Sequence, residues 1–167
     1  MHWRLKAYLA FFYICFFASR VLSHEISIDG KLDDPAWTSA DEYTKYYESL
    51  PFTLNEPKDF QKVLILEDEK GIYLGFINKQ DKETIRANRH ERDDEMANAD
   101  KAGLAIDFDG DGLAAYAFTV SAGGSIADGI YRNENEVNYD WDADWKSGVF
   151  VDKDYWYAEM FIPWSIA

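Results

Sequence analysis

Apolar and polar residues alternate along much of the chain after its first third, and a period of two is that of a β-strand with one buried face. In residues 71–79 the alternation places Ile72, Leu74 and Phe76 on one face, and residues 61–67 form a second apolar run. The charged stretch between the two runs ends in glycine and has the composition of a turn. This pattern predicts a β-hairpin.

Two more strand pairs show the same pattern. Residues 101–108 and 114–121 flank a turn of aspartates and glycines, and residues 148–152 and 155–162 flank a two-residue charged turn. The alternation in the last run predicts an inward-facing set of Trp156, Ala158, Met160 and Ile162. Several short strands at this spacing predict an all-β fold, an antiparallel, jelly-roll-like β-sandwich.

Helical signals are few and short. An acidic residue followed by proline opens residues 33–37, so we expect a short helix there and a second short turn at 93–100. Trp37 and Trp156 lie in patterned elements and are predicted to be core residues. Glu159 is the one acid in an apolar context, and its place in the alternation favours an outward or edge position.

The first 23 residues have the three zones of an export signal. Arg4 and Lys6 precede an uninterrupted apolar stretch at 7–18, and residues 21–23 form a small-residue cleavage pattern. Twelve apolar residues are fewer than the about 20 that a helix needs to cross a bilayer, which favours a cleaved signal peptide over a retained anchor. We therefore expect an exported protein, cleaved after Ser23, with one domain over residues 24–167.

Charge and cysteine content narrow the function further. The chain has 17 Lys and Arg against 31 Asp and Glu, a net charge of −14. This balance disfavours nucleic acid and anionic membrane surfaces as partners and suits neutral ligands and cations. The single cysteine, Cys15, lies in the leader, so the expected mature chain has no thiol for a nucleophile, a zinc-thiolate site or haem attachment.

Residues 107–112, DFDGDG, carry acids at alternate positions, as the first half of a calcium loop does. The candidate metal ligands are Asp107, Asp109 and Asp111. The twelfth position is Phe118 in place of a bidentate glutamate, which excludes an EF-hand. Two interpretations stay open: an acidic hairpin turn, or a structural calcium site completed by acids from elsewhere. The natural candidates for those acids are Asp93, Asp94 and Asp100.

Residues 28–37, IDGKLDDPAW, resemble the opening signature of the family 9 carbohydrate-binding modules and their relatives. Later features follow in a similar order: a hairpin at 63–79, RDD at 92–94, a strand ending in acid at 101–107, a glycine-containing strand pair around 122–124, WDADW at 141–145, and WYAEMFIP at 156–163. The resemblance covers residues 25–167, essentially all of the expected mature chain.

This resemblance implies a β-sandwich that binds sugars, often as part of a larger exported protein linked to polysaccharide degradation or uptake. One subgroup places the domain directly after a leader and ahead of an outer-membrane barrel, and the stretches at 92–94 and 141–145 are similar to that subgroup. The family continues past the position of Ala167 into a helical turn and further strands, so the resemblance implies a domain truncated at its C-terminus. The implied partners are a polysaccharide or oligosaccharide, and a catalytic domain or a membrane barrel in the same polypeptide. The implied location is extracellular, periplasmic or at the outer membrane.

A sugar site needs aromatic rings that stack on C–H faces and polar side chains that bond hydroxyl groups. These residue types are densest between residues 131 and 145, a segment that we expect to be a loop. The predicted carbohydrate-binding residues are Tyr131, Arg132, Asn133, Tyr139, Trp141 and Trp145. The alternative for both tryptophans is packing beneath one end of the sandwich, as is usual for large rings.

The sequence thus predicts a non-catalytic carbohydrate-binding module. With 31 acidic residues, close carboxylate pairs arise by chance, so we predict no catalytic residues here, and any hydrolase activity would lie elsewhere in the parent protein. The competing prediction is a structural or interaction domain ahead of a membrane barrel, without sugar binding. An aromatic groove at the predicted rings favours the first prediction, and burial of all those rings favours the second.

Overall fold

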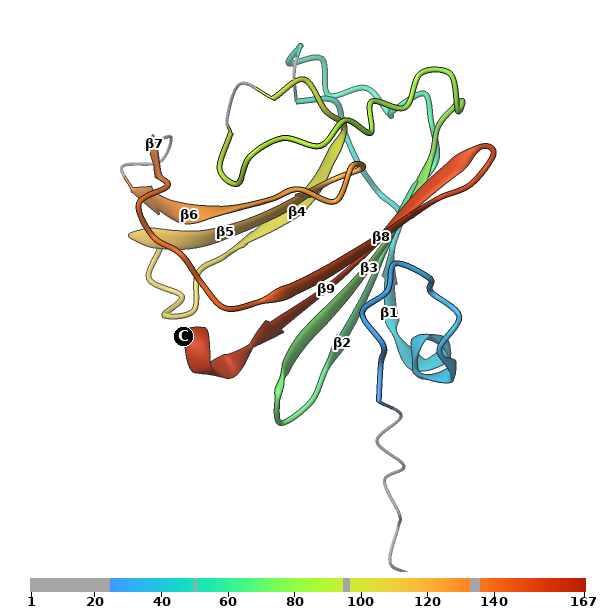
Figure 1. The fold of residues 1–167 in the computed structure, drawn as a ribbon. Helices are drawn as coiled ribbons and strands as arrows, with labels where there is room; N and C mark the ends of the chain where they lie inside the picture. The colour runs from blue at the N-terminus through green and yellow to red at the C-terminus, as the bar shows by residue number, and fades with distance from the viewer. Residues whose placement is uncertain (1–24, 50, 95–96, 133–135) are drawn as a thin grey trace, which may run out of the picture.

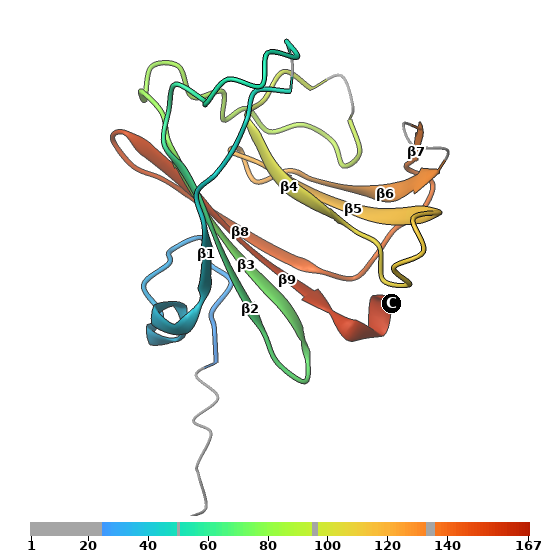
Figure 2. The same ribbon diagram turned by 180° about the vertical axis from the view of Figure 1, so that it is seen from behind.

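The computed structural model describes residues 25–49, 51–94, 97–132 and 136–167, and these form two antiparallel β-sheets packed face to face (Figures 1 and 2). This arrangement confirms the all-β sandwich expected from the alternation. The predicted leader, residues 1–23, and Asn133 of the predicted sugar site lie outside the described residues. Within those residues no helix has the length and apolar character needed to span a membrane.

The first sheet has five strands in the order β1-β2-β3-β9-β8, so β3 and β9 are central and β1 and β8 are edges. Its strands are β1 (Asp41–Tyr43), β2 (Gln61–Glu67), β3 (Gly71–Lys79), β8 (Lys146–Val151) and β9 (Tyr155–Pro163). The second sheet has four strands in the order β4-β5-β6-β7. These are β4 (Lys101–Ile106), β5 (Ala114–Ser121), β6 (Ile126–Arg132) and β7 (Glu136–Asn138).

The three predicted hairpins are present. The β2–β3 pair has the predicted limits. Strand β4 ends at Ile106, two residues before its predicted end, and β8 begins at Lys146, two residues before its predicted start. The predicted helix near Trp37 is a 3-10 turn, η1 (Pro35–Ser39), and a second turn, η2 (Trp164–Ile166), follows β9. A second short turn was expected at 93–100; the described part of that stretch contains no helix, and Ala97 donates from its backbone N–H to the Asp94 carbonyl at 3.3 Å.

One prediction needs correction: residues 131–145 are not all loop. Tyr131 and Arg132 end β6, and residues 136–138 form β7, which pairs with β6 at the edge of the second sheet. Within this segment only residues 139–145 are loop, and this loop crosses from β7 of the second sheet to β8 of the first (Figure 1). Part of the predicted sugar segment is therefore held in a sheet.

The core lies between the inner faces of the two sheets. From the first sheet it receives Leu74, Phe76 and the predicted inward set of β9, and from the second sheet Phe118 and Val120 of β5. Met160 and Phe118 are fully buried, and Trp156 is 3% exposed. Trp156 belongs to this core, as predicted. Trp37 is buried as expected, at 6% exposed, but it packs on the outer face of the first sheet beside Gly75, outside the cluster between the sheets.

Glu159 is the main departure from the pattern on β9. It alternates with the core residues Ala158 and Met160 and so faces the outer side of the sheet, yet its exposed fraction is 0%. Its Oε2 accepts hydrogen bonds from the backbone N–H groups of Asp29 at 2.9 Å and Gly30 at 2.8 Å. The predicted outward direction of Glu159 is therefore correct, but its burial was not expected, because the N-terminal segment covers this face.

The same carboxylate holds η1 in place. Trp37 donates from its indole Nε1 to Oε1 of Glu159 at 3.0 Å. Burial raises the pKa of Glu159, and the three N–H donors offset part of that rise. One side chain of β9 thus fixes both the opening turn at 29–30 and the first 3-10 helix.

Two glycines give the N-terminal segment access to Glu159. Gly75 of β3 and Gly148 of β8 are the register partners of Glu159 on either side. A Cβ atom on Gly75 would lie 2.5 Å from the Leu32 side chain, and one on Gly148 would lie 2.5 Å from the backbone nitrogen of Gly30. Any larger residue at either position would displace the segment that covers the carboxylate.

Candidate functional site

A groove of about 520 Å³ lies where the loop 139–145 passes the end of β9. It is lined by Trp141, Asp142, Ala143, Asp144, Lys146, Phe161, Pro163, Ser165 and Ile166. We call it the Trp141 groove. Its two aromatic rings come from different elements, Trp141 from the loop and Phe161 from β9, and carboxylate, ammonium and hydroxyl groups stand beside them.

Trp141 packs one edge of its ring on the core. Its centroid lies 5.0 Å from that of Tyr116 and 6.0 Å from that of Phe118, both in edge-on geometry. The residue is half-buried and also lines the groove. Trp141 therefore packs against the second sheet and also lines the groove.

Trp145 has a different environment. It is 7% exposed and belongs to the core, where its ring meets Phe118 edge-on with centroids 5.6 Å apart. Its indole Nε1 is buried without a hydrogen-bond partner among the described residues. Trp145 is thus a core ring, which was the alternative for this residue, and it offers no open platform to a sugar.

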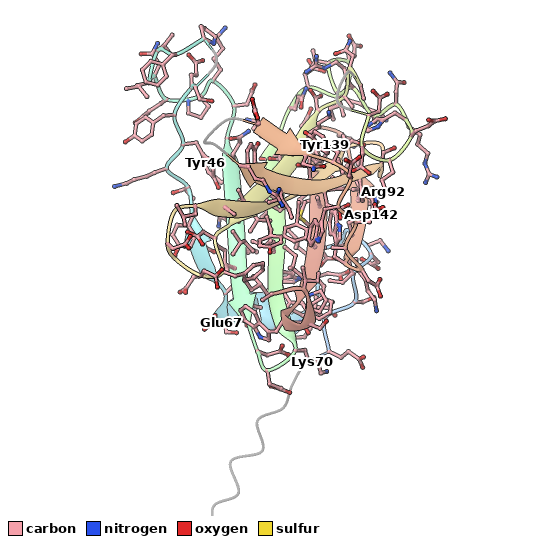
Figure 3. The ribbon with its side chains drawn as sticks, turned by 90° about the vertical axis from the view of Figure 1, so that its left-hand side faces the viewer. Tyr46, Glu67, Lys70, Arg92, Tyr139 and Asp142 are labelled. Carbon is pink, nitrogen blue, oxygen red and sulfur yellow. The ribbon has the colours of Figure 1, made fainter. Side chains whose placement is uncertain are left out.

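Tyr131 and Arg132, two other predicted sugar contacts, do not line the Trp141 groove. Tyr131 is opposite Ala115 in the register, and Tyr116, the next residue on β5, carries the ring that meets Trp141. Because neighbouring strand residues face opposite ways, Tyr131 lies on the outer face of the second sheet. There it lines a separate cavity of about 380 Å³ with Leu113 and Asp107. Arg132 is exposed at the end of β6, and Tyr139 is half-buried in the loop after β7 (Figure 3).

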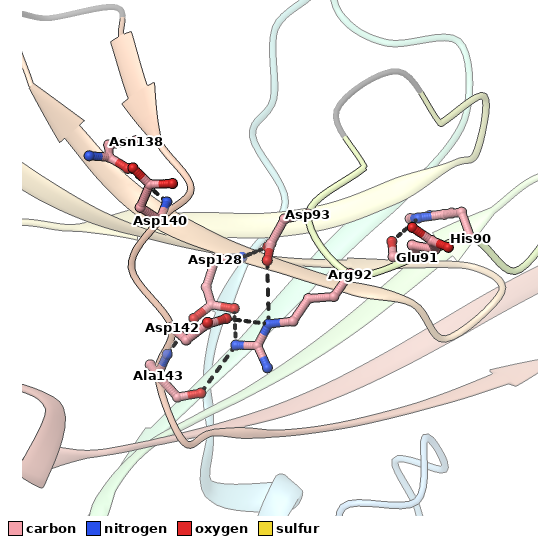
Figure 4. A network of polar contacts seen from close by, with 9 residues as sticks. All are labelled: His90, Glu91, Arg92, Asp93, Asp128, Asn138, Asp140, Asp142 and Ala143. Carbon is pink, nitrogen blue, oxygen red and sulfur yellow. Dashed lines mark hydrogen bonds and ion pairs between the residues drawn. The ribbon is translucent and has the colours of Figure 1, made fainter.

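A cluster around Arg92 fixes the loop that carries Trp141 (Figure 4). The Arg92 guanidinium donates from Nη2 to Asp128 and to the carbonyl oxygen of Ala143 at 3.3 Å, and its Nε pairs with Asp142 at 2.9 Å. The second oxygen of Asp128 accepts from the backbone N–H of Ala143 at 2.6 Å. The loop is therefore held at residues 142 and 143 by groups from β6 and from the long connection before β4.

Asp128 explains why this cluster needs an arginine. It lies opposite Phe118 in the register, so its side chain points to the inner face of the second sheet, and its exposed fraction is 0%. A buried carboxylate is stable only when it is paired and hydrogen-bonded. Arg92, 38% exposed, supplies the charge and keeps a path to solvent.

Asp93 completes the cluster. Its backbone adopts a left-handed φ of 60°, which aspartate tolerates better than most residues, and its Oδ1 accepts from the backbone N–H of Asp128 at 2.9 Å. Burial raises the pKa of Asp93, against the lowering effect of that hydrogen bond. The nearest approach of Asp93 to the Arg92 guanidinium is 3.5 Å.

Oxygens of Asp93, Asp128 and Asp142 lie within 4.8 Å of one another, the spacing of a metal-ligand set. All three acids also contact the Arg92 guanidinium, which provides the positive charge that an ion would otherwise bring. A cation at this point requires Arg92 to leave, so the residues present fit an arginine-centred ion cluster better than a metal centre.

The predicted calcium ligands are arranged differently. Among the described residues Asp107, Asp109 and Asp111 do not form a group of converging oxygens. Asp107 instead accepts from the backbone N–H of Gly110 at 2.8 Å with one oxygen and of Gly112 at 2.7 Å with the other. These hydrogen bonds, with that from Gly112 the strongest, lower the pKa of Asp107. The geometry is that of a side chain that caps an acidic hairpin turn.

The acids expected to complete a calcium site are also engaged elsewhere. Asp100 is bound by Arg86, which donates from its backbone N–H at 2.9 Å and from its Nε at 3.0 Å, and by Gln80 at 2.8 Å. These bonds outweigh burial and lower the pKa of Asp100. The calcium assignment stays a prediction, now with a more specific test.

Sequence reasoning missed the roles of Arg92 and Asp128. The signal for Arg92 was the charged stretch at 92–94, which was noted only for its resemblance to a family. For Asp128 the signal was an acid within the apolar stretch 126–131. Neither protein-family models nor curated proteins match this sequence.

Proposed function

We propose that the domain is a non-catalytic carbohydrate-binding module and that the Trp141 groove is its binding site. The observation that carries this proposal is the composition of the groove, which is lined by the aromatic residues Trp141 and Phe161 together with acidic, lysine and serine residues. Sugars present apolar C–H faces and a rim of hydroxyl groups, and this set of side chains matches both. The volume, about 520 Å³, falls within the range of about 300–1,000 Å³ typical of small-molecule sites.

Preorganisation supports the same proposal. The Arg92 cluster fixes Asp142 and Ala143, and Tyr116 and Phe118 fix the ring of Trp141. A binding loop that is already ordered does not lose conformational entropy when the ligand arrives. The net charge of −14 also suits a neutral ligand better than an acidic polysaccharide.

The second candidate is an interaction domain of an exported protein that does not bind sugar. Burial of Trp145 and the core packing of Trp141 favour it, because they give both rings a structural role. Under this alternative the groove has no glycan ligand, and replacing its polar side chains has no effect on retention by polysaccharides.

Affinity electrophoresis in gels that contain hydroxyethyl cellulose, arabinoxylan or laminarin tests the proposal. We expect the wild-type protein to be retarded in at least one gel. Asp144→Asn, which keeps the size of an exposed side chain and removes its charge, should reduce the retardation, and Trp141→Ala should abolish it. Asp109→Asn, an exposed acid in the distant hairpin turn, is the matched control and should migrate like the wild type.

Trp141→Ala also removes core contacts, so urea denaturation of each variant must accompany the gels. The assay temperature is set where every variant is folded. Wild-type protein that migrates at the same rate in all gels would refute sugar binding. Retardation that Trp141→Ala leaves undiminished in a folded protein would place the site elsewhere.

A further inference from the structure

A second surface differs in composition from the rest of the molecule. The segment from Tyr43 to Phe60, between β1 and β2, carries most of the large exposed apolar side chains among the described residues. These are Tyr43 (54% exposed), Tyr47 (62%), Phe52 (78%), Leu54 (56%) and Phe60 (45%). Clusters of exposed apolar side chains rimmed by polar residues commonly mark binding sites.

The two ends of this segment enclose a groove of about 530 Å³, which we call the Tyr46 groove. It is lined by Thr44, Lys45, Tyr46, Tyr47, Glu56, Pro57, Lys58, Asp59, Phe60 and Gln61. Figure 3 labels Tyr46 well away from Asp142, so this groove and the Trp141 groove are distinct. The nine residues that line the Trp141 groove share no member with it.

Local hydrogen bonds shape the segment. Glu48 donates from its backbone N–H to the carbonyl of Asn55 at 2.9 Å, and Leu54 donates to the carbonyl of Glu48 at 3.1 Å. The Thr53 hydroxyl donates to the Glu48 carboxylate at 2.6 Å. Leu54 holds a left-handed φ of 56°, a conformation that costs about 1–3 kcal/mol for such a residue. Backbone strain of this kind is found most often at ligand sites, where the shape of a loop matters.

The opposite wall is tied to the first sheet. The carbonyl of Phe60 accepts from the backbone N–H of Lys79 at 2.8 Å, and Gln61 pairs with Asn78 at the start of β2. A smaller cavity of about 190 Å³ shares Tyr46 and Gln61 with the groove and extends inward to Asn78. Asn78 is 8% exposed, and its amide donates to the Trp156 carbonyl at the long distance of 3.5 Å. The groove therefore continues toward a buried amide that is weakly bonded.

The charges of the groove cancel. Two lysines, Lys45 and Lys58, and two acids, Glu56 and Asp59, line it, so the lining is neutral on a protein of net charge −14. An ion gains nothing from such a lining, whereas a neutral ligand with many hydroxyl groups finds donors and acceptors on both walls. The rings of Tyr46, Tyr47 and Phe60 supply apolar faces between them.

We propose that the Tyr46 groove is a second binding site for a neutral glycan chain, and that the domain binds polysaccharides through two separate grooves. This inference rests on the proposed function, because it assigns the same ligand class to a new place. Two sites on one domain raise the retention of a long chain well above that of a short one, because the second contact is intramolecular. Oligosaccharides too short to reach both grooves gain no such advantage.

The test uses the same gels with three proteins: Tyr47→Ala, Trp141→Ala, and the double variant. Tyr47 is 62% exposed, so its truncation opens no cavity and should leave the midpoint of urea denaturation unchanged from the wild type. We expect each single variant to retain part of the retardation and the double variant to retain none. Phe150→Ala, which truncates a ring that is 40% exposed on β8 and lines neither groove, is the control. Tyr73→Ala is unsuitable as a control because the Tyr73 ring packs on Phe161, which lines the Trp141 groove.

Under this inference Trp141→Ala weakens retention without abolishing it, so the two proposals predict different outcomes for that variant. If Trp141→Ala abolishes retention and Tyr47→Ala has no effect, the second site is refuted and the first proposal stands. If Tyr47→Ala alone abolishes retention, the Trp141 groove is not a sugar site, and the two-groove proposal is also refuted. Absence of retardation in every gel refutes both proposals. A dimer in sedimentation velocity that Tyr47→Ala dissolves, with unchanged retardation, would identify a second copy of the chain as the occupant.

Discussion

Glu159→Ala is the most informative single change in the fold, because one carboxylate accepts from three N–H donors of the N-terminal segment. The variant leaves the backbone N–H of Gly30 and the indole N–H of Trp37 without an acceptor, whereas the backbone N–H of Asp29 keeps the Ser27 carbonyl at 3.0 Å. An unsatisfied buried polar group costs about 1–3 kcal/mol. We take the low end for each of these two groups and expect a loss of about 2 kcal/mol in the free energy of unfolding.

The matched variant Glu159→Gln separates the acceptor from the charge. Glutamine keeps the volume and one oxygen, and it imitates the neutral carboxyl group. Because burial raises the pKa of Glu159, the neutral form is less disfavoured here than in water, and we expect Gln to cost about 1 kcal/mol or less. The raised pKa also means that the wild type loses some stability as pH rises from about 4.5 through the pKa of the folded state, a step that Glu159→Gln lacks.

Urea denaturation followed by tryptophan fluorescence measures these differences, with the slope compared to confirm that the unfolded states are alike. Glu67→Ala, an exposed glutamate at the end of β2, is the control and should lie within about 0.5 kcal/mol of the wild type. A Glu159→Ala protein as stable as this control would show that the carboxylate does not hold the N-terminal segment. Equal losses for Ala and Gln would show that the charge, and not the acceptor, is what matters.

Three further outcomes follow from the cluster and the turns. Arg92→Ala leaves Asp128 buried without its cation and should cost about 3 kcal/mol in urea denaturation, whereas Arg92→Lys should cost less; equal costs would mean that charge contributes nothing. The lowered pKa of Asp100 contributes stability above about pH 3.8, and this contribution is lost as pH falls below that value. Asp100→Asn should therefore weaken the fall of the melting temperature at acid pH, and an unchanged acid-pH dependence would contradict this. Millimolar calcium should raise the melting temperature only if Asp107 gives up its hydrogen bonds from Gly110 and Gly112. Equal melting temperatures with calcium and with chelator would identify residues 107–112 as a capped turn without an ion.

The strands that sequence reasoning found are those whose pairing is local. In β2–β3 and β8–β9 the alternation and the charged turn lie within one short stretch, so the pattern alone determines the hairpin. The apolar alternation did not predict β6, because Asp128 and Gly129 interrupt its apolar positions; a strand pair around 122–124 was expected only from the family resemblance. Asp128 is tolerated there only through Arg92, 36 residues earlier in the chain, and no local pattern indicates that contact.

The same limit applies to the candidate site. The sequence shows two tryptophans four residues apart, Trp141 and Trp145, with the same neighbours, yet one lines a groove and the other is buried. The difference arises from where each ring meets Phe118 of β5, a tertiary contact. For Glu159 the alternation gave the correct face of the sheet but not its burial, because the covering segment comes from the other end of the described chain.

The contact between Asp29 and Glu159 spans 130 residues, and this separation bears on the order in which the molecule folds. During synthesis, residues 29–37 appear long before β9 exists, and until then the backbone N–H of Gly30 and the indole N–H of Trp37 lack the acceptor that they have in the folded domain. Contacts between distant residues form late because a long loop must first be closed. The segment must therefore wait, solvated, until β3, β8 and β9 have assembled the outer face on which it docks. A chain halted before Glu159 would keep this segment open to proteases, and completion of β9 would close it.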